Sequence, residues 1–332
     1  MTNCSAPGLR ALGLLFMVAV LSSAVAVGAQ DPIRVAIVAP SSIRDLSWSQ
    51  SIHSSLKALQ EEMGGESVLH IAYSEAMSSV SAASETLRGY AEDGFDIIIA
   101  HGTQYGTSIF DMAHEFPNTS FAWGTATDTG SDRGINNVYA YQAAAEEGGY
   151  VNGVMAALLT ETNVIGAIGP IPAGDVRLYI SGFTRGVKSA NPDAEVLVVY
   201  VGSFSDIAAG TTNGRTLLAA GADVLTGTSQ VVVGAIEAVR SAGGYWFSTQ
   251  SDQGNVWPGT VVSSQVYNWV PMLRDIIERF QDGQYGGIAY KLTLANDGLR
   301  IAFGTVDISP QMLMAAGQAV EDIIDGTVVI SS

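Results

Sequence analysis

A short polar stretch, RDLSWSQS at residues 44–51, contains side chains that suit the binding of a small molecule. Asp45 offers a carboxylate, Trp48 a flat apolar ring, and Ser49 and Gln50 a hydroxyl and an amide. A ring that stacks on a flat guest and polar groups that orient it are typical of small-molecule sites. The stretch also suits a helix start, because Asp45 or Ser47 could cap it and Trp48 could pack there half-buried.

Hydroxyls, amides and glycines follow the later apolar runs too, for example at residues 170–175, and a second ring, Phe204, lies in one such stretch. Phe204 could be a packing residue, but rings at equivalent positions of two half-chains favour a stacking clamp with Trp48. Asp45 and Asp252 could instead be helix caps, and a turn explains Gly102 most simply. The predicted ligand-binding residues are Asp45, Trp48, Ser49, Gln50, His101, Gly102, Thr125, Phe204, Ser229, Gln230, Gln250 and Asp252.

Catalysis has little support in the sequence. Of the four histidines only His101 follows a predicted strand, and it could pair with Asp45 or Asp128 as acid and base. No nucleophile elbow, phosphate-binding Gly-Lys-Ser or His-Glu-x-x-His motif occurs. We therefore predict a binding protein with no catalytic residue, no metal site and no cofactor.

Along the chain, short apolar runs alternate with longer segments in which apolar residues recur at the spacing of a helix. These strands and helices must position the predicted ligand-binding residues. Runs that are apolar throughout are typical of strands buried on both faces, and one helix per crossover makes neighbouring strands parallel. The predicted fold is therefore α/β, with two doubly wound parallel-sheet lobes and a hinge. Ligands bind such sheets at the carboxyl ends of the strands. We expect strands at 33–38, 67–73, 95–100, 119–123, 164–169, 195–201, 222–227 and 245–249, and helices at 47–63, 78–92, 105–116, 143–160, 175–190, 206–219, 231–242, 268–282 and 310–325.

The boundaries of the two lobes follow from the repeat of this pattern. We assign residues 30–138 and about 267–285 to lobe 1, and residues 139–266 and about 286–332 to lobe 2. The chain after residue 260 fits either lobe by its pattern alone, and a return across the hinge gives two or three connections.

The first 29 residues have the features of a secretory signal peptide. Arg10 precedes an apolar run, and the small residues VGA precede Gln30, so we predict cleavage after Ala29 and export to a periplasm or cell surface. A retained anchor is the alternative. The only cysteine, Cys4, would leave with the leader, which excludes disulfides and thiol chemistry. The formal net charge of −17 makes nucleic acid and anionic lipid poor partners.

Several segments together resemble one family of transport proteins. The segments DLSWSQS, EEGGYVNGVMAA, IGPIPAGDVRLYISGFTRGVKSANP, VGSFSD, GADVLTGTSQ and STQSDQ resemble, in order, those of the basic membrane protein (BMP) family, the PnrA-like solute-binding proteins of ABC importers. The resemblance covers residues 33 to about 305. It implies a type I periplasmic binding fold that closes on a purine nucleoside and presents it to a membrane permease.

The resemblance also assigns roles to particular positions. Trp48 falls on the family's stacking ring and Ser49 on its base-reading asparagine. Gln250 falls on the aspartate that holds ribose, and Tyr267 on the lysine that assists it, so Tyr267 joins the predicted ligand-binding residues. Both changes remove a charge. A purine nucleoside and a free nucleobase therefore remain equal candidates, and another aromatic or sugar-like solute stays open.

The expected partners of this protein are a small molecule and a membrane permease. We expect a monomer that binds a nucleoside or nucleobase and docks on an ABC permease. The same fold could instead serve as the ligand-binding sensor component of a membrane receptor, or, less in keeping with the residues, as an exported nucleoside-processing enzyme.

Overall fold

The computed structural model describes residues 1–3 and 31–330. The apolar run of the predicted leader and the cleavage site after Ala29 lie outside these residues. Contacts divide the chain into Met1–Asp31 and Pro32–Ser332, and every helix and strand below lies in the second unit. No helix in the described residues is long and apolar enough to cross a membrane.

The first sheet is entirely parallel and has the strand order β11-β5-β4-β3-β1-β2. Its strands are β1 (Ile33–Val38), β2 (Leu69–Ser74), β3 (Ile97–Ala100), β4 (Ser120–Gly124), β5 (Val138–Ala143) and β11 (Ala289–Leu292). Its helices are α1 (Trp48–Met63), α2 (Val80–Glu92), α3 (Gly106–Glu115) and α8 (Val270–Gln281), with short 3-10 turns η1 (Thr103–Tyr105) and η2 (Ser131–Arg133).

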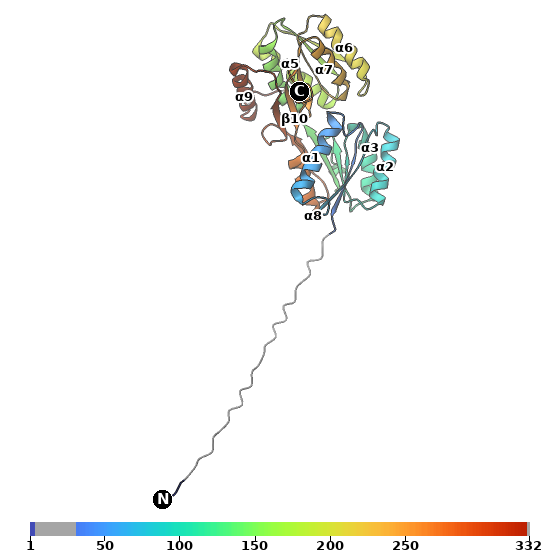
Figure 1. Ribbon diagram of the computed structural model, residues 1–332. Helices are drawn as coiled ribbons and strands as arrows, with labels where there is room; N and C mark the ends of the chain where they lie inside the picture. Colours follow the sequence, from blue (N-terminus) through green and yellow to red (C-terminus); the bar gives the residue numbers. More distant parts are fainter. Residues whose placement is uncertain (4–30, 331–332) are drawn as a thin grey trace. The chain divides into compact units, whose positions relative to one another are not determined.

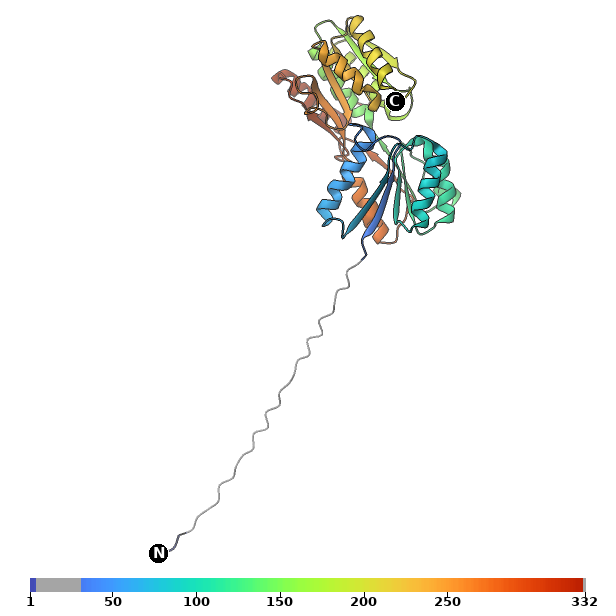
Figure 2. The ribbon, with the colours of Figure 1, turned by 45° about the vertical axis from the view of Figure 1, so that its right-hand side comes forward.

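Helices cover both faces of this sheet. Val35 and Ile37 of β1 pack in one core cluster with α1 and α8, whereas Ala36 and Val38 pack in a second cluster with α2 and α3. The alternation follows from the two-residue period of a strand. Figure 1 shows α1 beside α8, and Figure 2 shows α2 and α3 on the opposite face of the strands from α1.

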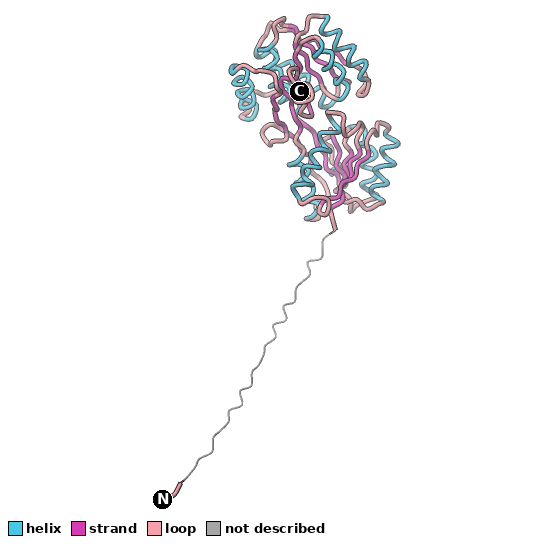
Figure 3. The backbone as a smooth tube through the Cα atoms, in the orientation of Figure 1, coloured by secondary structure: helices cyan, strands magenta, loops and turns pink. Residues whose placement is uncertain are grey.

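The second sheet has the order β12-β10-β9-β8-β6-β7, and only β12 runs antiparallel to its neighbour. Its strands are β6 (Val164–Gly169), β7 (Glu195–Tyr200), β8 (Val224–Gly227), β9 (Tyr245–Gln250), β10 (Val261–Tyr267) and β12 (Leu299–Phe303). The remaining helices are α4 (Ala145–Leu159), α5 (Gly174–Ala190), α6 (Ile207–Ala219), α7 (Val233–Ser241) and α9 (Pro310–Ile324), with η3 (Gln230–Val232) before α7. In Figure 3 the strands of each sheet lie between helices.

Glycines let α4 and α5 approach each other closely. A Cβ at Gly182 would lie 2.1 Å from the carbonyl oxygen of Glu146, and a Cβ at Gly153 would lie 2.1 Å from that of Phe183. Residue numbers rise together along both helices in these contacts, so the helices are parallel and their amino ends lie at the same end. The glycine-containing segments EEGGYVNG and SGFTRG therefore have a packing role.

The α/β prediction is confirmed, and each predicted strand and helix has a counterpart whose ends agree within two residues. Four strands were missed: β5, β10, β11 and β12. Only one residue separates β5 from α4, so no turn signal marks its end, and β11 and β12 are short edge strands.

Strand pairing also differs from the expected lobe boundaries in two places. β5 pairs with β4, and β11 pairs with β5, so both belong to the first sheet, although residues 139–143 and 289–292 were assigned to lobe 2. The chain therefore passes between the sheets three times, after β5, after β10 and after β11. The division into two hinged lobes stays a prediction.

Candidate ligand-binding site

The stretch RDLSWSQS forms the turn that begins α1, and Asp45 caps this helix. Its Oδ1 accepts hydrogen bonds from the backbone amides of Ser47 (2.8 Å) and Gln50 (3.1 Å). Its Oδ2 accepts from the amide of Ser49 (3.0 Å) and from the hydroxyl of Ser41 (2.6 Å). With four donors from its own segment, the carboxylate is occupied, and the capping interpretation of Asp45 is the one that the geometry supports.

Trp48 lies in a buried stack of rings and is not an open platform. The indole is 9% exposed, and its ring lies 4.0 Å from that of His101 with an interplanar angle of 11°. Its Nε1 donates to the carbonyl oxygen of His101 at 3.0 Å. His101 stacks in turn towards Tyr141, and Trp269 meets Trp48, His101 and Tyr141 edge-on. The expected open ring at the end of the first strand therefore has one face covered from within the same sheet.

His101 is a neutral structural residue in this stack, not a rim residue. It is completely buried, and burial lowers its pKa to about 3. Its Nε2 lies 3.1 Å from the carbonyl oxygen of Trp48, which can only accept, so Nε2 carries the proton. Its Nδ1 then accepts from the hydroxyl of Tyr141 at 2.7 Å. Both ring nitrogens are occupied, which argues against an acid–base role with Asp45 or Asp128.

The expected partner ring, Phe204, is 45% exposed, and no aromatic ring in residues 31–330 stacks on it. The predicted clamp of Trp48 and Phe204 is therefore not assembled in this structure. Asp252 is also exposed, and its Oδ1 accepts from the amide of Gly254 at 2.9 Å within a turn.

Other predicted residues are satisfied within their own segments. The hydroxyl of Ser49 bonds to that of Ser41 at 2.6 Å, and Gln50 Oε1 accepts from the amide of Leu46 at 2.9 Å. Ser229 donates to Gln230 Oε1 at 2.7 Å. At Gly102 the backbone is extended, with φ at 176°, so no turn conformation requires glycine there; a Cβ would instead lie 2.6 Å from the side chain of Gln104.

Several contacts join the strand-end loops of the two sheets. The hydroxyl of Ser47 donates to Gln250 Oε1, and Ser251 Oγ donates to the carbonyl oxygen of Ser47 at 2.9 Å. Gln253 Nε2 donates to the carbonyl oxygen of Leu46 at 2.6 Å. A Cβ at Gly174 would lie 3.2 Å from Thr125 Cγ2, so the turn after β4 meets the start of α5. The carboxyl ends of the two sheets therefore face each other, as ligand binding requires.

A group of buried polar atoms lies where these ends meet. Near these strand ends, six side chains have buried polar atoms that form no hydrogen bond with any described residue. Such groups are rare in native proteins and call for a partner. They are Glu146 (Oε2), Asp175 (both oxygens), Thr228 (Oγ1), Thr249 (Oγ1), Gln265 (both amide atoms) and Tyr267 (hydroxyl).

Burial and charge together shift the pKa values of members of this group. Burial raises the pKa of Asp175 to about 7, and Glu146 adds to the rise. Burial also raises the pKa of Tyr267 well above 10, with a further contribution from Asp175. Tyr267 was predicted from the sequence; Asp175, Glu146, Thr228, Thr249 and Gln265 were missed. Asp175 had a visible signal, since it ends the polar stretch 170–175 that follows a strand.

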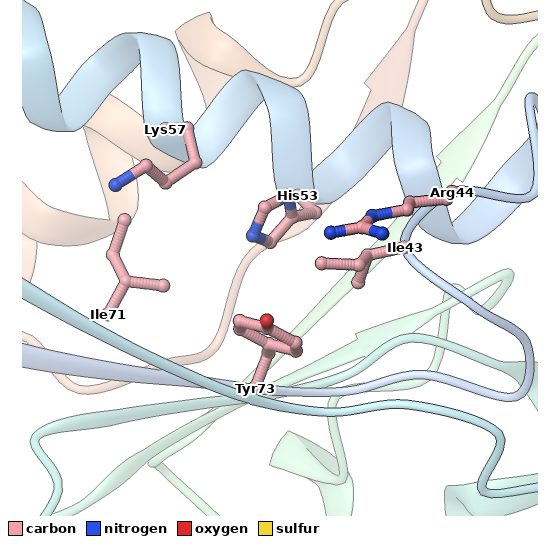
Figure 4. A pocket seen from close by; sticks show the side chains of 6 residues that line it. All are labelled: Ile43, Arg44, His53, Lys57, Ile71 and Tyr73. Carbon is pink, nitrogen blue, oxygen red and sulfur yellow. The ribbon is translucent and has the colours of Figure 1, made fainter.

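Two surface pockets lie away from these residues. One, of about 390 Å³, lies between α1 and β2 and is shown in Figure 4. It is lined by Ile43, Arg44, His53, Lys57, Ile71 and Tyr73. A second, of about 440 Å³, is lined by residues of the opposite, amino-terminal side of the second sheet, including Asp223 and Tyr245. None of the predicted ligand-binding residues lines either pocket. No group of three His, Cys, Asp or Glu residues in the described chain could hold a metal ion.

Two sheets whose carboxyl-terminal ends meet around buried polar groups define a two-sheet α/β ligand-binding protein. The family model described as "ABC transporter substrate-binding protein PnrA-like", Bmp, matches residues 33–324, and the chain belongs to this family. The family consists of extracytoplasmic substrate-binding proteins of ABC transporters, which take a small-molecule ligand and a membrane permease as partners and are not an enzyme class.

Individual relatives are distant. The chain is 26% identical over 257 residues to a purine-binding protein of Brucella abortus, covering 77% of this chain and 71% of that one. It is 25% identical over 312 residues to an ABC transporter nucleoside-binding protein, BmpA, of Lactococcus lactis, covering 87% and 86%. A solute-binding protein of Aeropyrum pernix has the same fold, with a TM-score of 0.75 at 19% identity over 90% of this chain and 93% of that one.

Proposed function

We propose that this ABC transporter substrate-binding protein binds a purine nucleoside or nucleobase, or a similar flat heterocycle, between its two sheets. The observation that carries the proposal is the group of buried, unpartnered polar atoms at the meeting strand ends, which a ligand with donors and acceptors would satisfy. The printed names of the Brucella and Lactococcus relatives, purine-binding and nucleoside-binding, support the same ligand class.

Closure over the ligand would bring the exposed Phe204 into the site. A ligand that contacts both sheets only in the closed arrangement shifts the population towards that arrangement. Trp48, 9% exposed and stacked on His101, would form a packed wall behind the site, and Tyr267, Gln250 and Ser229 would provide polar contacts. Delivery to a membrane permease would follow from the closed form.

Titration calorimetry with purine nucleosides and their free bases tests the proposal. We expect at least one purine to bind, and a base and its ribonucleoside to bind within about tenfold, or 1.4 kcal/mol, because Gln250 and Tyr267 carry no charge for the sugar. A hundredfold preference for the nucleoside would contradict the second expectation. Failure of every purine to bind would overturn the proposed ligand class, and conversion of the nucleoside during incubation would indicate an enzyme instead.

We also propose that a signal peptide exports this binding protein and is removed after Ala29. Amino-terminal sequencing of the protein from its native cells is expected to begin at Gln30. A sequence that begins within residues 1–10 would indicate a retained anchor.

A further inference from the structure

We propose that Asp175 determines ligand specificity, with its carboxylate accepting hydrogen bonds from two adjacent donor groups of the ligand. The inference rests on the proposed function only in placing a ligand at the meeting strand ends. Two chemistries supply adjacent donors: a pair of vicinal hydroxyls on a sugar, or a ring N–H next to an amino group on a heterocycle. Both match a carboxylate, which has two acceptor oxygens side by side.

Asp175 is the most deeply buried carboxylate of the site. The residue is 5% exposed, and neither oxygen has a hydrogen-bond partner among the described residues. It lies in the first turn of α5, yet Ala173 occupies the cap position and no side chain caps this helix. Asp206, at the start of α6, shows the contrast, since it is exposed and its Oδ1 accepts from the amide of Ala209 at 2.9 Å. Helix capping therefore does not explain why Asp175 is buried.

No cationic side chain among the described residues pairs with Asp175, and only the amino terminus of α5 favours its charge. No salt bridge to this residue exists within residues 31–330, and the charge that acts on it most strongly comes from another acid, Glu146. The backbone of Glu146 packs against α5 at Gly182, about two turns beyond Asp175, and its charge still acts on Asp175. Lys291 contacts Glu146 Oε1 at 3.5 Å, with a side chain that is 60% exposed. A ligand that donates hydrogen bonds would therefore supply what the protein does not.

The neighbours of Asp175 determine what else such a ligand must offer. The hydroxyls of Tyr267 and Thr249 can each donate or accept, and the amide of Gln265 can do both. The carboxylate of Asp175 can only accept when ionised. The site therefore selects paired donors at Asp175 and tolerates either kind of group beside them.

Proton release provides a second readout of the same contact. Burial raises the pKa of Asp175 to about 7, so the free protein holds this carboxyl partly protonated near neutral pH. Donor groups from a ligand favour the ionised form and lower the pKa. Binding at pH 7 should therefore release protons, and calorimetry in buffers of different ionisation enthalpy measures that release.

The test compares wild-type protein with Asp175→Asn, an isosteric change that replaces one acceptor oxygen with a donor group. The probes are adenosine against 2′-deoxyadenosine, guanine against hypoxanthine, and D-ribose alone. In each pair the second compound lacks one of the two adjacent donors. Asp206→Asn is the matched control, because it alters an exposed carboxylate at another helix start.

We expect wild-type protein to bind one compound with both adjacent donors more tightly than its partner that lacks one. A preference for adenosine over 2′-deoxyadenosine would identify sugar hydroxyls as the donors. A preference for guanine over hypoxanthine would identify the base. Asp175→Asn should bind the preferred compound about 10- to 100-fold more weakly, the range of hydrogen bonds to a charged group, and lose both the preference and the proton release. Asp206→Asn should retain wild-type affinity. If Asp175→Asn does not fold, the preference of wild-type protein within the two pairs still decides whether the site reads two adjacent donors.

Other binding results would overturn the role of Asp175, the proposed purine ligand, or both. Equal weakening of both members of a pair, a preference that persists in Asp175→Asn, or binding without proton release would overturn the role of Asp175. Purine binding with no preference in either pair would overturn it and leave the proposed function standing. Binding of D-ribose but of no purine, weakened in Asp175→Asn, would support Asp175 and overturn the purine proposal. If no probe with adjacent donors binds, both fail.

Discussion

Two helices begin at the carboxyl ends of the two sheets, and an aspartate accompanies each, but the two carboxylates have opposite environments. Asp45, before α1, accepts four hydrogen bonds and is half-buried. Asp175, in α5, is buried and accepts none from the described residues. A helix start can therefore satisfy a carboxylate or isolate it, and only the isolated one is free for a ligand.

The rings at the two sheets differ in the same way. Trp48 is packed between its own sheet and the core cluster that continues to Val176 and Tyr179 of α5. Ring neighbours thus surround Trp48 at the first sheet, whereas Phe204 at the second sheet is exposed and has no ring neighbour among the described residues.

Removal of the packed ring should have the largest effect. We expect Trp48→Ala to lower the free energy of unfolding by about 3–5 kcal/mol, because a buried ring is lost together with its stack on His101. Urea unfolding measures this change. Unaltered stability with weakened ligand binding would show that the indole serves the ligand and not the core.

The pH dependence of stability should have opposite signs at His101 and Asp175. Burial lowers the pKa of His101 to about 3, below its unfolded value of 6.5, so its contribution is present above pH 6.5 and is lost as the pH falls towards 3. Burial raises the pKa of Asp175 to about 7, above 3.8, so its contribution is present below 3.8 and is lost as the pH rises through 7.

At 1.36 kcal/mol for each unit of pKa shift, the effect is at most about 4 kcal/mol for Asp175 and about 5 kcal/mol for His101. Urea unfolding at pH 4, 5.5 and 7 measures both. The stability of wild type relative to Asp175→Asn should increase as the pH falls, and that of wild type relative to His101→Gln should decrease. Parallel trends for the two variants would contradict the assigned environments.

Substitution of either carboxylate, Asp45 or Asp175, should change the unfolding free energy less than the loss of Trp48. We expect Asp45→Ala to cost about 1–2 kcal/mol of unfolding free energy, the range for losing a helix cap, with ligand affinity retained. Asp175→Asn should be at least as stable as wild type at pH 8, because it removes a buried charge without a partner. A loss of affinity in Asp45→Ala without a loss of stability would reverse the roles assigned to the two residues.

The smallest change in stability belongs to the exposed ring. Phe204→Ala should alter the unfolding free energy by less than about 0.5 kcal/mol, as surface substitutions do. If closure brings Phe204 onto a flat ligand, affinity should fall by about 1–3 kcal/mol, the range for stacking of a base on an aromatic ring. Calorimetry with the purine that binds wild type provides the comparison, and unchanged affinity would exclude Phe204 from the site.

Local pattern predicted much of the fold. Runs such as IRVAIV and FDIIIA read as buried strands, and the helical segments between them required parallel order. The missed strand β5 adjoins α4 without a turn, and the edge strands β11 and β12 lack a long apolar run. The pairing of β11 and β12 depends on which sheet edge is available to them, and only the folded chain determines that.

The candidate site was less predictable, because residue type and position at a strand end do not specify hydrogen-bond partners. The sequence by itself determined the α/β class, the order of elements and the strand ends at which polar groups gather, since these depend on periodicity along the chain. Only the tertiary structure decided that Asp45 caps its own helix, that His101 covers Trp48, and that Asp175 is enclosed without a partner. The physical reason is that burial and hydrogen bonding depend on groups brought together from distant parts of the chain.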